Sequence, residues 1–247
     1  MPDIIQSGHI NSPSDGVTQG LYEESSAQQG NLGAIRRLGD GRTYRYSYFS
    51  AAVNRGVLCS PDISAGGVVE VDGKLTAASI GDVTITATDA GTLGSATADQ
   101  YAGAYLHTTD DAGEGFTYRI KGNTAASSNA VDFSLYDPLV VAVTTATDIA
   151  ITPFPYNNVK IASPTDCILC GVSVRTMQAS YYGWVQTSGV ATVLSDAAIA
   201  LGTIVTLSDG VDGAVHAQDA YTEPPVGYTT MASDDTGHVG AVLQLGD

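Results

Sequence analysis

Histidine serves both in acid–base catalysis and as a metal ligand at neutral pH, and this chain of 247 residues contains four histidines. They are His9, His107, His216 and His238, and no two of them are close along the sequence. Two metal ligands on one strand or helix would need a spacing such as H-x-H or H-x-x-x-H, and neither spacing occurs. The sequence therefore predicts no metal site and no cofactor, and the four residues are interpreted as ordinary imidazoles.

The cysteines are the next candidates for chemistry. Cys167 and Cys170 form a C-x-x-C pair, and Cys59 is the third cysteine of the chain. A disulfide framework normally has an even and denser set of cysteines, and a zinc site would need a second pair. In a strand, residues three apart point to opposite faces. We interpret the cysteines as buried, reduced thiols.

Carboxylates gather in two glycine-containing loops, which hold Asp110, Asp111 and Glu114 in one case and Asp234 and Asp235 in the other. The spacing of a calcium-binding EF-hand is absent, so solvated acidic turns are the simplest interpretation. Paired carboxylates could also hydrolyse glycosidic bonds, but one tryptophan is few for stacking on sugars. No nucleophile, phosphate or dinucleotide motif occurs. The sequence predicts a protein that is not an enzyme.

Basic residues are few and concentrated. Residues 36–55 contain five of the ten Lys and Arg residues and one acidic residue, Asp40, although the whole chain has 26 Asp and Glu and a net charge of −16. A basic patch on an acidic protein often contacts an acidic partner surface or a neighbouring subunit. The alternative is that these arginines pair with carboxylates of the same chain.

Three tyrosines, each two residues from the next, lie in the same segment as these arginines. Tyr44, Tyr46 and Tyr48 alternate with Arg45 and Ser47, so one face of a strand carries three phenol rings. Such a stripe suits a core or a subunit interface, because tyrosine combines apolar area with a polar tip. Seven residues are predicted to bind a partner: Arg36, Arg37, Arg42, Arg45, Tyr44, Tyr46 and Tyr48.

Short alternating runs separated by glycine or Asp-Gly extend over most of the chain, and they indicate strands and tight turns. The run 83–88 (VTITAT) is one example, and Val131, Phe133 and Leu135 define the apolar face of another. The pattern G-[DE]-G-x-T-Y-R occurs twice, at 39–45 and 113–119, and each copy is a glycine turn leading into a strand. Almost no segment has the periodicity of an amphipathic helix. The sequence predicts an all-β protein.

Composition and proline positions suggest three parts. Residues 1–35 have no Lys or Arg and few large apolar side chains, which predicts an extended N-terminal arm. Pro153, Pro155 and Pro164 interrupt the strand pattern and indicate a boundary. We expect a β-sandwich-like domain over 36–160 and a small β-barrel over 161–247.

The negative charge also limits the partners, because an acidic surface repels nucleic acid and anionic membranes. The chain opens with Met1-Pro2-Asp3 and without the pattern of a signal peptide, and no apolar run reaches the ~18 residues of a membrane span. We expect synthesis in a cytoplasm and no partner that is a nucleic acid, a membrane or a small-molecule substrate.

The last third of the chain resembles the small β-barrel of decoration (cement) proteins from the heads of tailed bacteriophages. The resemblance lies in short phrases at 181–189 (YYGWVQTSG), 193–196, 200–203, 212–215 and 226–228. It implies a virion structural protein on the capsid exterior, commonly a homotrimer, that bridges major capsid protein subunits and stabilises the shell. It implies no catalytic residue.

A second function stays open from the sequence. An all-β virion protein can also be a tail fibre or spike module that binds a receptor or glycan on the host surface. A major capsid protein fits less well, because its fold needs a long spine helix that this sequence lacks.

Overall fold

A computed structural model of the chain describes residues 16–62, 69–89, 93–164, 166, 168–220, 223–233 and 236–246. Its regular structure consists of strands, apart from a short 3-10 turn at Leu93–Ser95, so the predicted all-β class is confirmed. Within these residues no helix has the length and apolar character that crossing a membrane requires.

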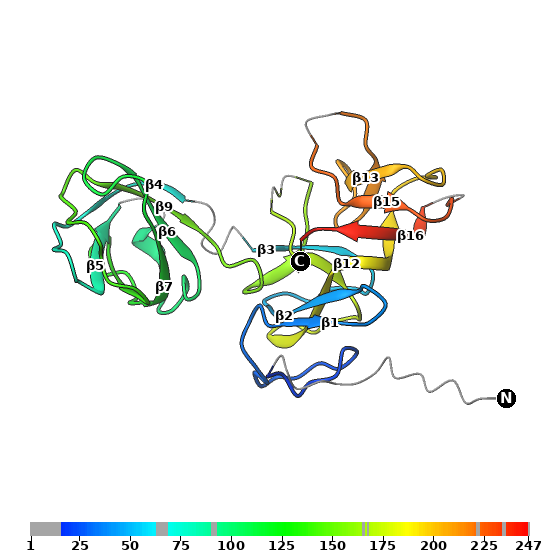
Figure 1. Cartoon of the computed structure of the whole chain (residues 1–247), viewed down its shortest axis with the longest axis horizontal. Coiled ribbons are helices and arrows are strands. Elements are labelled where there is room, and N and C mark those ends of the chain that lie inside the picture. Colours follow the sequence, from blue (N-terminus) through cyan, green and yellow to red (C-terminus); the bar gives the residue numbers. More distant parts are fainter. Residues whose placement is uncertain are drawn as a thin grey trace. The chain divides into compact units, whose positions relative to one another are not determined.

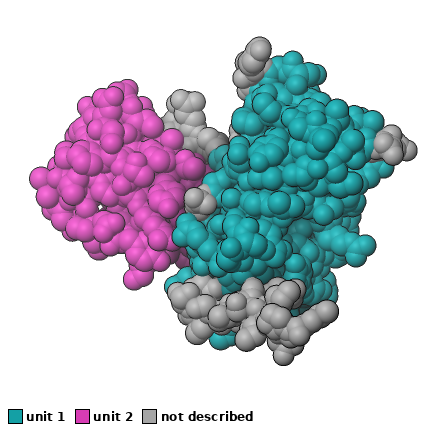
Figure 2. All heavy atoms as spheres, turned by 45° about the vertical axis from the view of Figure 1, so that its right-hand side comes forward, with its two compact units in different colours: residues 1–61, 155–247 teal, residues 62–154 magenta. Residues whose placement is uncertain are grey.

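The chain forms two compact units, shown in different colours in Figure 2. In the sequence, the second unit interrupts the first. Unit 1 consists of residues 1–61 and 155–247, and unit 2 consists of residues 62–154. The division therefore differs from the expected domains of 36–160 and 161–247. The reason is a long-range pairing: Val159, which follows the insertion, pairs with both Phe49 and Pro61, which precede it. Local sequence patterns carry no trace of such a contact.

Unit 2 is a closed barrel of six antiparallel strands in the order β4-β5-β8-β7-β6-β9 (Figure 1). The strands are β4 (Val69–Leu75), β5 (Thr84–Thr88), β6 (Tyr105–Asp110), β7 (Thr117–Asn123), β8 (Ala130–Leu135) and β9 (Asp148–Thr152). Alternate side chains point into the barrel, and the predicted apolar face of Val131, Phe133 and Leu135 is buried there. Ile149 and Ile151 from β9 complete the same core.

Unit 1 contains the other ten strands, joined in one sheet. They are β1 (Ile35–Arg37), β2 (Thr43–Phe49), β3 (Leu58–Pro61), β10 (Val159–Ile161), β11 (Gly171–Ser173), β12 (Tyr181–Ser195), β13 (Ile204–Leu207), β14 (Val215–Ala217), β15 (Gly227–Thr229) and β16 (Gly237–Gln244).

The long strand β12 belongs to two closed rings of strands. Its first half pairs with β2 and β11, and these connect through β10 and β3. Its second half pairs with β16 and β14, and these connect through β15 and β13. The second ring lies in the region where the sequence predicts a small barrel.

Between the two halves of β12 the register shifts at Gln186/Ser188, and Gly189 has a φ of +84°. A Cβ atom on Gly189 would lie 2.9 Å from Cα of Arg42. This position therefore needs glycine both for its backbone conformation and for its close approach to the segment that contains Arg42.

Residues 16–34 belong to unit 1 and pack against its sheet. Val17 and Leu21 are 2% and 8% exposed and contact the cluster of Tyr44, Tyr46 and Trp184. A segment with few large apolar residues is ordered here because these two meet an aromatic surface of the same chain. This part of the expected arm, unlike our expectation, is covered by its own chain, and residues 1–15 lie outside the described residues.

The repeated G-[DE]-G-x-T-Y-R pattern lies in one hairpin of each unit, and the second hairpin has the longer loop. The first copy connects β1 to β2 and the second connects β6 to β7. Gly41 and Gly115 occupy corresponding places in the two turns, with φ of +88° and +85°. The pattern therefore marks a turn that each unit uses once.

The insertion of unit 2 leads to a prediction. Because Pro61 already pairs with Val159, a short Gly-Ser linker in place of residues 62–154 should leave unit 1 folded. Trp184 is the only tryptophan and lies buried in unit 1, so its fluorescence reports on this unit alone. We expect cooperative thermal unfolding by tryptophan fluorescence, with a midpoint close to that of the full chain. A shortened chain without a cooperative transition would contradict the two-unit description.

Candidate binding site

Arg36, the first residue predicted to bind a partner, is buried inside unit 1 with 5% of its surface exposed. Its guanidinium lies 4.2 Å from the centre of the Trp184 ring and donates hydrogen bonds to the carbonyl oxygens of Gln19 (2.9 Å) and Val17 (2.7 Å). The cation–π contact and the two charge-assisted hydrogen bonds offset the desolvation of the charge. Arg36 therefore holds the N-terminal segment in place and is not available to a partner.

The tyrosine stripe is also covered by the chain itself. Tyr44 and Tyr46 are 1% and 0% exposed, and Tyr48 is half-buried. The Tyr46 hydroxyl donates to Oε1 of Gln19 and accepts from the backbone N–H of Gln29. Burial raises the pKa of Tyr44 to about 12, so its phenol stays neutral. Tyr44 and Tyr46 are thus core residues, which corrects their assignment to a partner-binding surface.

The remaining arginines of the group differ in burial and in their contacts. Arg45 is half-buried, with its guanidinium 5.4 Å from the centre of the Tyr156 ring and a hydrogen bond to the carbonyl of Gly33. Arg37 is exposed on the short strand β1. The five arginines that are neighbours in sequence therefore do not form one patch.

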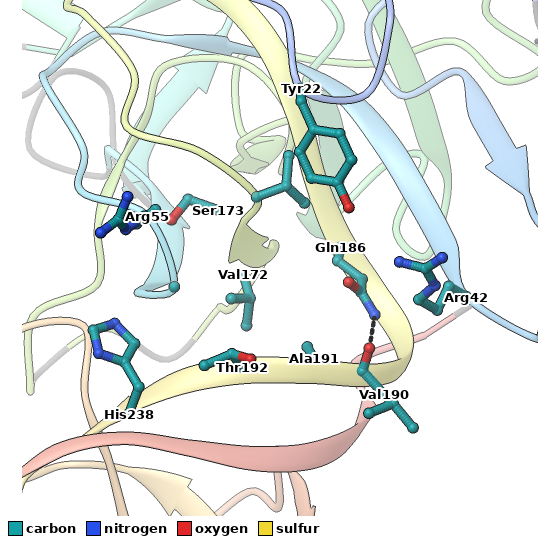
Figure 3. Close-up of a pocket in the computed structure, with 12 residues that line it drawn as sticks. Tyr22, Arg42, Arg55, Val172, Ser173, Gln186, Val190, Ala191, Thr192 and His238 are labelled. Carbon is teal, nitrogen blue, oxygen red and sulfur yellow. Dashed lines mark hydrogen bonds between the residues drawn. The ribbon is translucent and has the colours of Figure 1, made fainter. Parts of the chain in front are cut away.

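Two members of the group, Arg42 and Arg55, line a pocket of about 390 Å³ in unit 1. Figure 3 shows Arg55 and His238 on one side of the pocket and Arg42 on the opposite side. Tyr22 and Gln186 lie between them, and the Gln186 side chain donates a hydrogen bond to the carbonyl of Val190 (2.9 Å). The pocket lies where β12 passes from one ring to the other.

The turn that carries Arg55 is held by both neighbouring strands. The N–H of Gly56 donates to the carbonyl of Ser173 on β11 (2.8 Å), and the Gly56 carbonyl accepts from the N–H of Leu194 on β12 (2.7 Å). Gly56 has a φ of +71°, and a Cβ there would lie 2.8 Å from the His238 ring. Only glycine allows the turn and the imidazole to lie this close together. These backbone hydrogen bonds therefore hold the turn that carries Arg55 next to His238.

The charge of the pocket is opposite to that of the chain. Its lining contains Arg42, Arg55 and His238 but no carboxylate. Arg42 forms an ion pair with Asp40 at 2.7 Å. Asp40 itself does not line the pocket. Arg55 is exposed and makes no hydrogen bond or ion pair with the described residues. Such a lining suits a carboxylate, because a guanidinium can donate two hydrogen bonds to its oxygens.

A row of apolar side chains continues from the pocket across four strands. Val190 on β12 pairs with Val242 on β16, which pairs with Tyr228 on β15, which in turn pairs with Ile204 on β13. Residues paired in this way point to the same face of a sheet. Val190, Tyr228 and Ile204 are 59%, 41% and 50% exposed, and Val242 is half-buried. This apolar row lies on the outer surface of the second ring.

The pocket and the apolar row share one face. Thr192 and His238, which line the pocket, lie two and four residues along β12 and β16 from Val190 and Val242, so the alternation of strands places them on the same outer side. We call this surface the docking face; it comprises Arg42, Arg55, His238, Val190, Val242, Tyr228 and Ile204. It combines a cationic pocket with an apolar surface.

The two described cysteines have a structural role. Cys59 and Cys170 are buried free thiols, and burial raises the pKa of Cys59 to about 12 and that of Cys170 well above its usual value. Both are therefore protonated and unreactive at neutral pH. Cys167 and the pair Asp234 and Asp235 lie outside the described residues.

Sequence reasoning missed most of the docking face. It included Arg42, but not Arg55 as a site residue, His238 or the apolar row. Val239, Ala241 and Leu243 alternate along β16 and are buried. The same alternation could have placed His238 and Val242 on the outer face, but no local signal shows that β12 lies beside them.

Comparison of the chain with protein-family models, with curated proteins and with solved structures gives no match.

Adjacent arginines give a matched test of the buried cation. Replacing Arg36 by Met should lower the free energy of unfolding of unit 1 by about 2–4 kcal/mol, because two carbonyls lose charged hydrogen bonds and Trp184 loses its cation. The Arg37→Met variant should change it by less than about 0.5 kcal/mol, because this side chain is exposed. Urea unfolding followed by tryptophan fluorescence measures both. Equal effects of the two substitutions would show that Arg36 does not have this role.

Proposed function

We propose that this chain is a non-enzymatic structural protein of a tailed-phage virion, which decorates the outside of the capsid and bridges major capsid protein subunits. The docking face is the observation that carries the proposal. The resemblance of the last third of the chain to decoration proteins supports the identity of the partner.

A protein partner suits this surface better than a small ligand does. Protein interfaces are rich in arginine, tyrosine and apolar side chains, with a fully buried apolar centre and a polar rim. The apolar row supplies Tyr228, Ile204 and Val190, and the adjoining pocket supplies Arg42 and Arg55. We infer that an acidic side chain of the capsid protein enters the pocket while apolar side chains beside it cover the row.

The acidic character of the chain makes this pocket selective. With a net charge of −16 the protein repels most acidic surfaces. An acidic partner would be attracted only where the local charge is positive, so the pocket determines where it docks. The same net charge disfavours a nucleic acid or a membrane as the partner.

Assembly and location complete the proposal. A homotrimer would match the three-fold and quasi-three-fold positions of a capsid by its own symmetry. The protein would be synthesised in the host cytoplasm and then bind the capsid exterior. Arg37 and Tyr48, which are exposed and half-buried, stay predicted partner contacts outside the docking face.

A tail fibre or spike module that binds a host receptor or glycan is the second candidate function. The observation that favours it is the pocket itself. Its volume of about 390 Å³ and its mixture of arginine, tyrosine and amide groups would suit one acidic sugar.

Charge reversal in the pocket tests the proposed function. Arg55→Glu should weaken binding to purified capsids at least about tenfold at 0.1 M salt, because it replaces a charge-assisted hydrogen bond with repulsion. Lys121→Glu is the matched control, because it changes the net charge equally on an exposed residue of unit 2. Co-sedimentation with capsids over a range of salt concentrations measures both. Equal weakening by the two variants would mean that general charge, and not the pocket, governs docking.

The location of the protein on the particle separates the two functions. Labelled antibodies against the chain should mark phage heads in electron micrographs. Labelling confined to tails, together with inhibition of host attachment by an acidic sugar, would overturn capsid decoration in favour of receptor binding.

The apolar row gives an independent prediction. Ile204→Glu should weaken capsid binding at least about tenfold, because a carboxylate would be buried against apolar partner atoms. The stability of the Ile204→Glu variant should change little, since Ile204 is 50% exposed. Ile80→Glu is the control, because Ile80 is 68% exposed in unit 2. Unchanged capsid binding by Ile204→Glu would exclude the row from the interface.

A further inference from the structure

Three side chains that are separated along the sequence meet in unit 1, outside the lining of the docking pocket. The carboxylates of Asp209 and Glu223 and the imidazole of His216 have ligand atoms within 4.8 Å of one another. We propose that they bind a divalent transition metal ion of the Zn²⁺ class. The sequence alone predicted no metal site, because the three residues belong to no recognised ligand spacing and lie on different segments.

Each ligand is held by local structure. His216 is the middle residue of β14 and pairs with Thr206 on β13. The Glu223 segment is fixed by a hydrogen bond from the Gln218 side chain to the Glu223 carbonyl (2.8 Å). Asp209 follows β13 in a turn whose N–H groups at Gly210 and Val211 donate to the Ser208 hydroxyl. The three donors therefore come from a strand, a turn and a loop that the fold brings together.

The imidazole supplies an observation independent of the carboxylates. Nε2 of His216 is buried and makes no hydrogen bond. Its nearest carboxylate oxygen, Oε2 of Glu223, is 3.7 Å away, which is too far for a hydrogen bond. A buried ring nitrogen that has a carboxylate nearby but no hydrogen bond is costly, and a bound ion is one of the few explanations. This nitrogen points toward the carboxylate with which it would share a metal.

The donor set selects the kind of metal. Imidazole nitrogen is a common ligand of Zn²⁺ and its neighbours, whereas Ca²⁺ and Mg²⁺ prefer oxygen ligands alone. Two carboxylates offset the charge of a divalent ion. Metal–ligand bonds of about 2.0–2.2 Å place tetrahedral ligand atoms roughly 3.3–3.6 Å apart. The three donor atoms lie within 4.8 Å of one another, so they would move slightly closer together around the ion. Water would occupy the fourth position.

A metal at this position would fasten the loop that carries Glu223 to the β13–β14 hairpin. Ion binding to the folded chain alone would then stabilise unit 1. The inference does not rest on the proposed function, because none of the three ligands lines the docking pocket.

Titration of the full chain with Zn²⁺ after treatment with a chelator tests the site. Calorimetry should show one Zn²⁺ bound per chain, and the midpoint of thermal unfolding by Trp184 fluorescence should rise. His216→Ala and Glu223→Gln should each lower the affinity at least about tenfold. Co²⁺ in place of Zn²⁺ should give visible absorption bands that the His216→Ala variant lacks. Ca²⁺ should not compete.

Matched variants exclude other zinc ligands. His238→Ala removes an exposed imidazole of the same unit, and Cys167→Ser removes a thiol; both should bind Zn²⁺ as the natural chain does. If His216→Ala does not fold, Glu223→Gln alone decides, because it preserves size and shape. Absence of Zn²⁺ binding, loss of binding in Cys167→Ser, or unchanged binding in Glu223→Gln would each overturn the proposal.

Discussion

Everything in unit 1 depends on the continuous backbone pairing of β12. One strand of fifteen residues supplies hydrogen bonds to β2 and β11 at one end and to β14 and β16 at the other. Because a strand must satisfy its N–H and C=O groups along its whole length, the two rings cannot be formed independently. The bend at Gly189 is where they diverge, and the pocket lies beside it.

The first half of β12 is buried on both faces, which is unusual for a strand in a small barrel. Val185 faces the inside of its ring with Phe49 and Cys59, whereas Trp184 faces outward. The outward face is covered by residues 17–38 of the same chain, with Arg36 placed over the indole. Arginine suits position 36 because its guanidinium reaches two backbone carbonyls of a segment that has no regular structure of its own.

Charge and apolar surface together define how unit 1 can meet another protein. The excess of carboxylates keeps most of the chain repulsive toward acidic surfaces, so the pocket with Arg42 and Arg55 stands out by contrast. The apolar row beside the pocket supplies apolar surface that a partner can bury, which the charged pocket alone does not offer. The proposed ion site serves a different purpose, since it would stiffen the β13–β14 hairpin, and its three ligands do not line the pocket.

The sequence by itself determined the all-β class, the two glycine-led hairpins and the inward faces of strands such as β8 and β16. These follow from alternation and turn chemistry, which are local properties. Only the tertiary structure decided that unit 2 is an insertion, that Arg36, Tyr44 and Tyr46 are core, and that Arg55 lies beside His238. Those facts depend on pairings between distant segments, such as β2 with β12 and β3 with β10. Local sequence cannot reveal them, because a strand edge pairs through backbone groups that every residue type except proline shares.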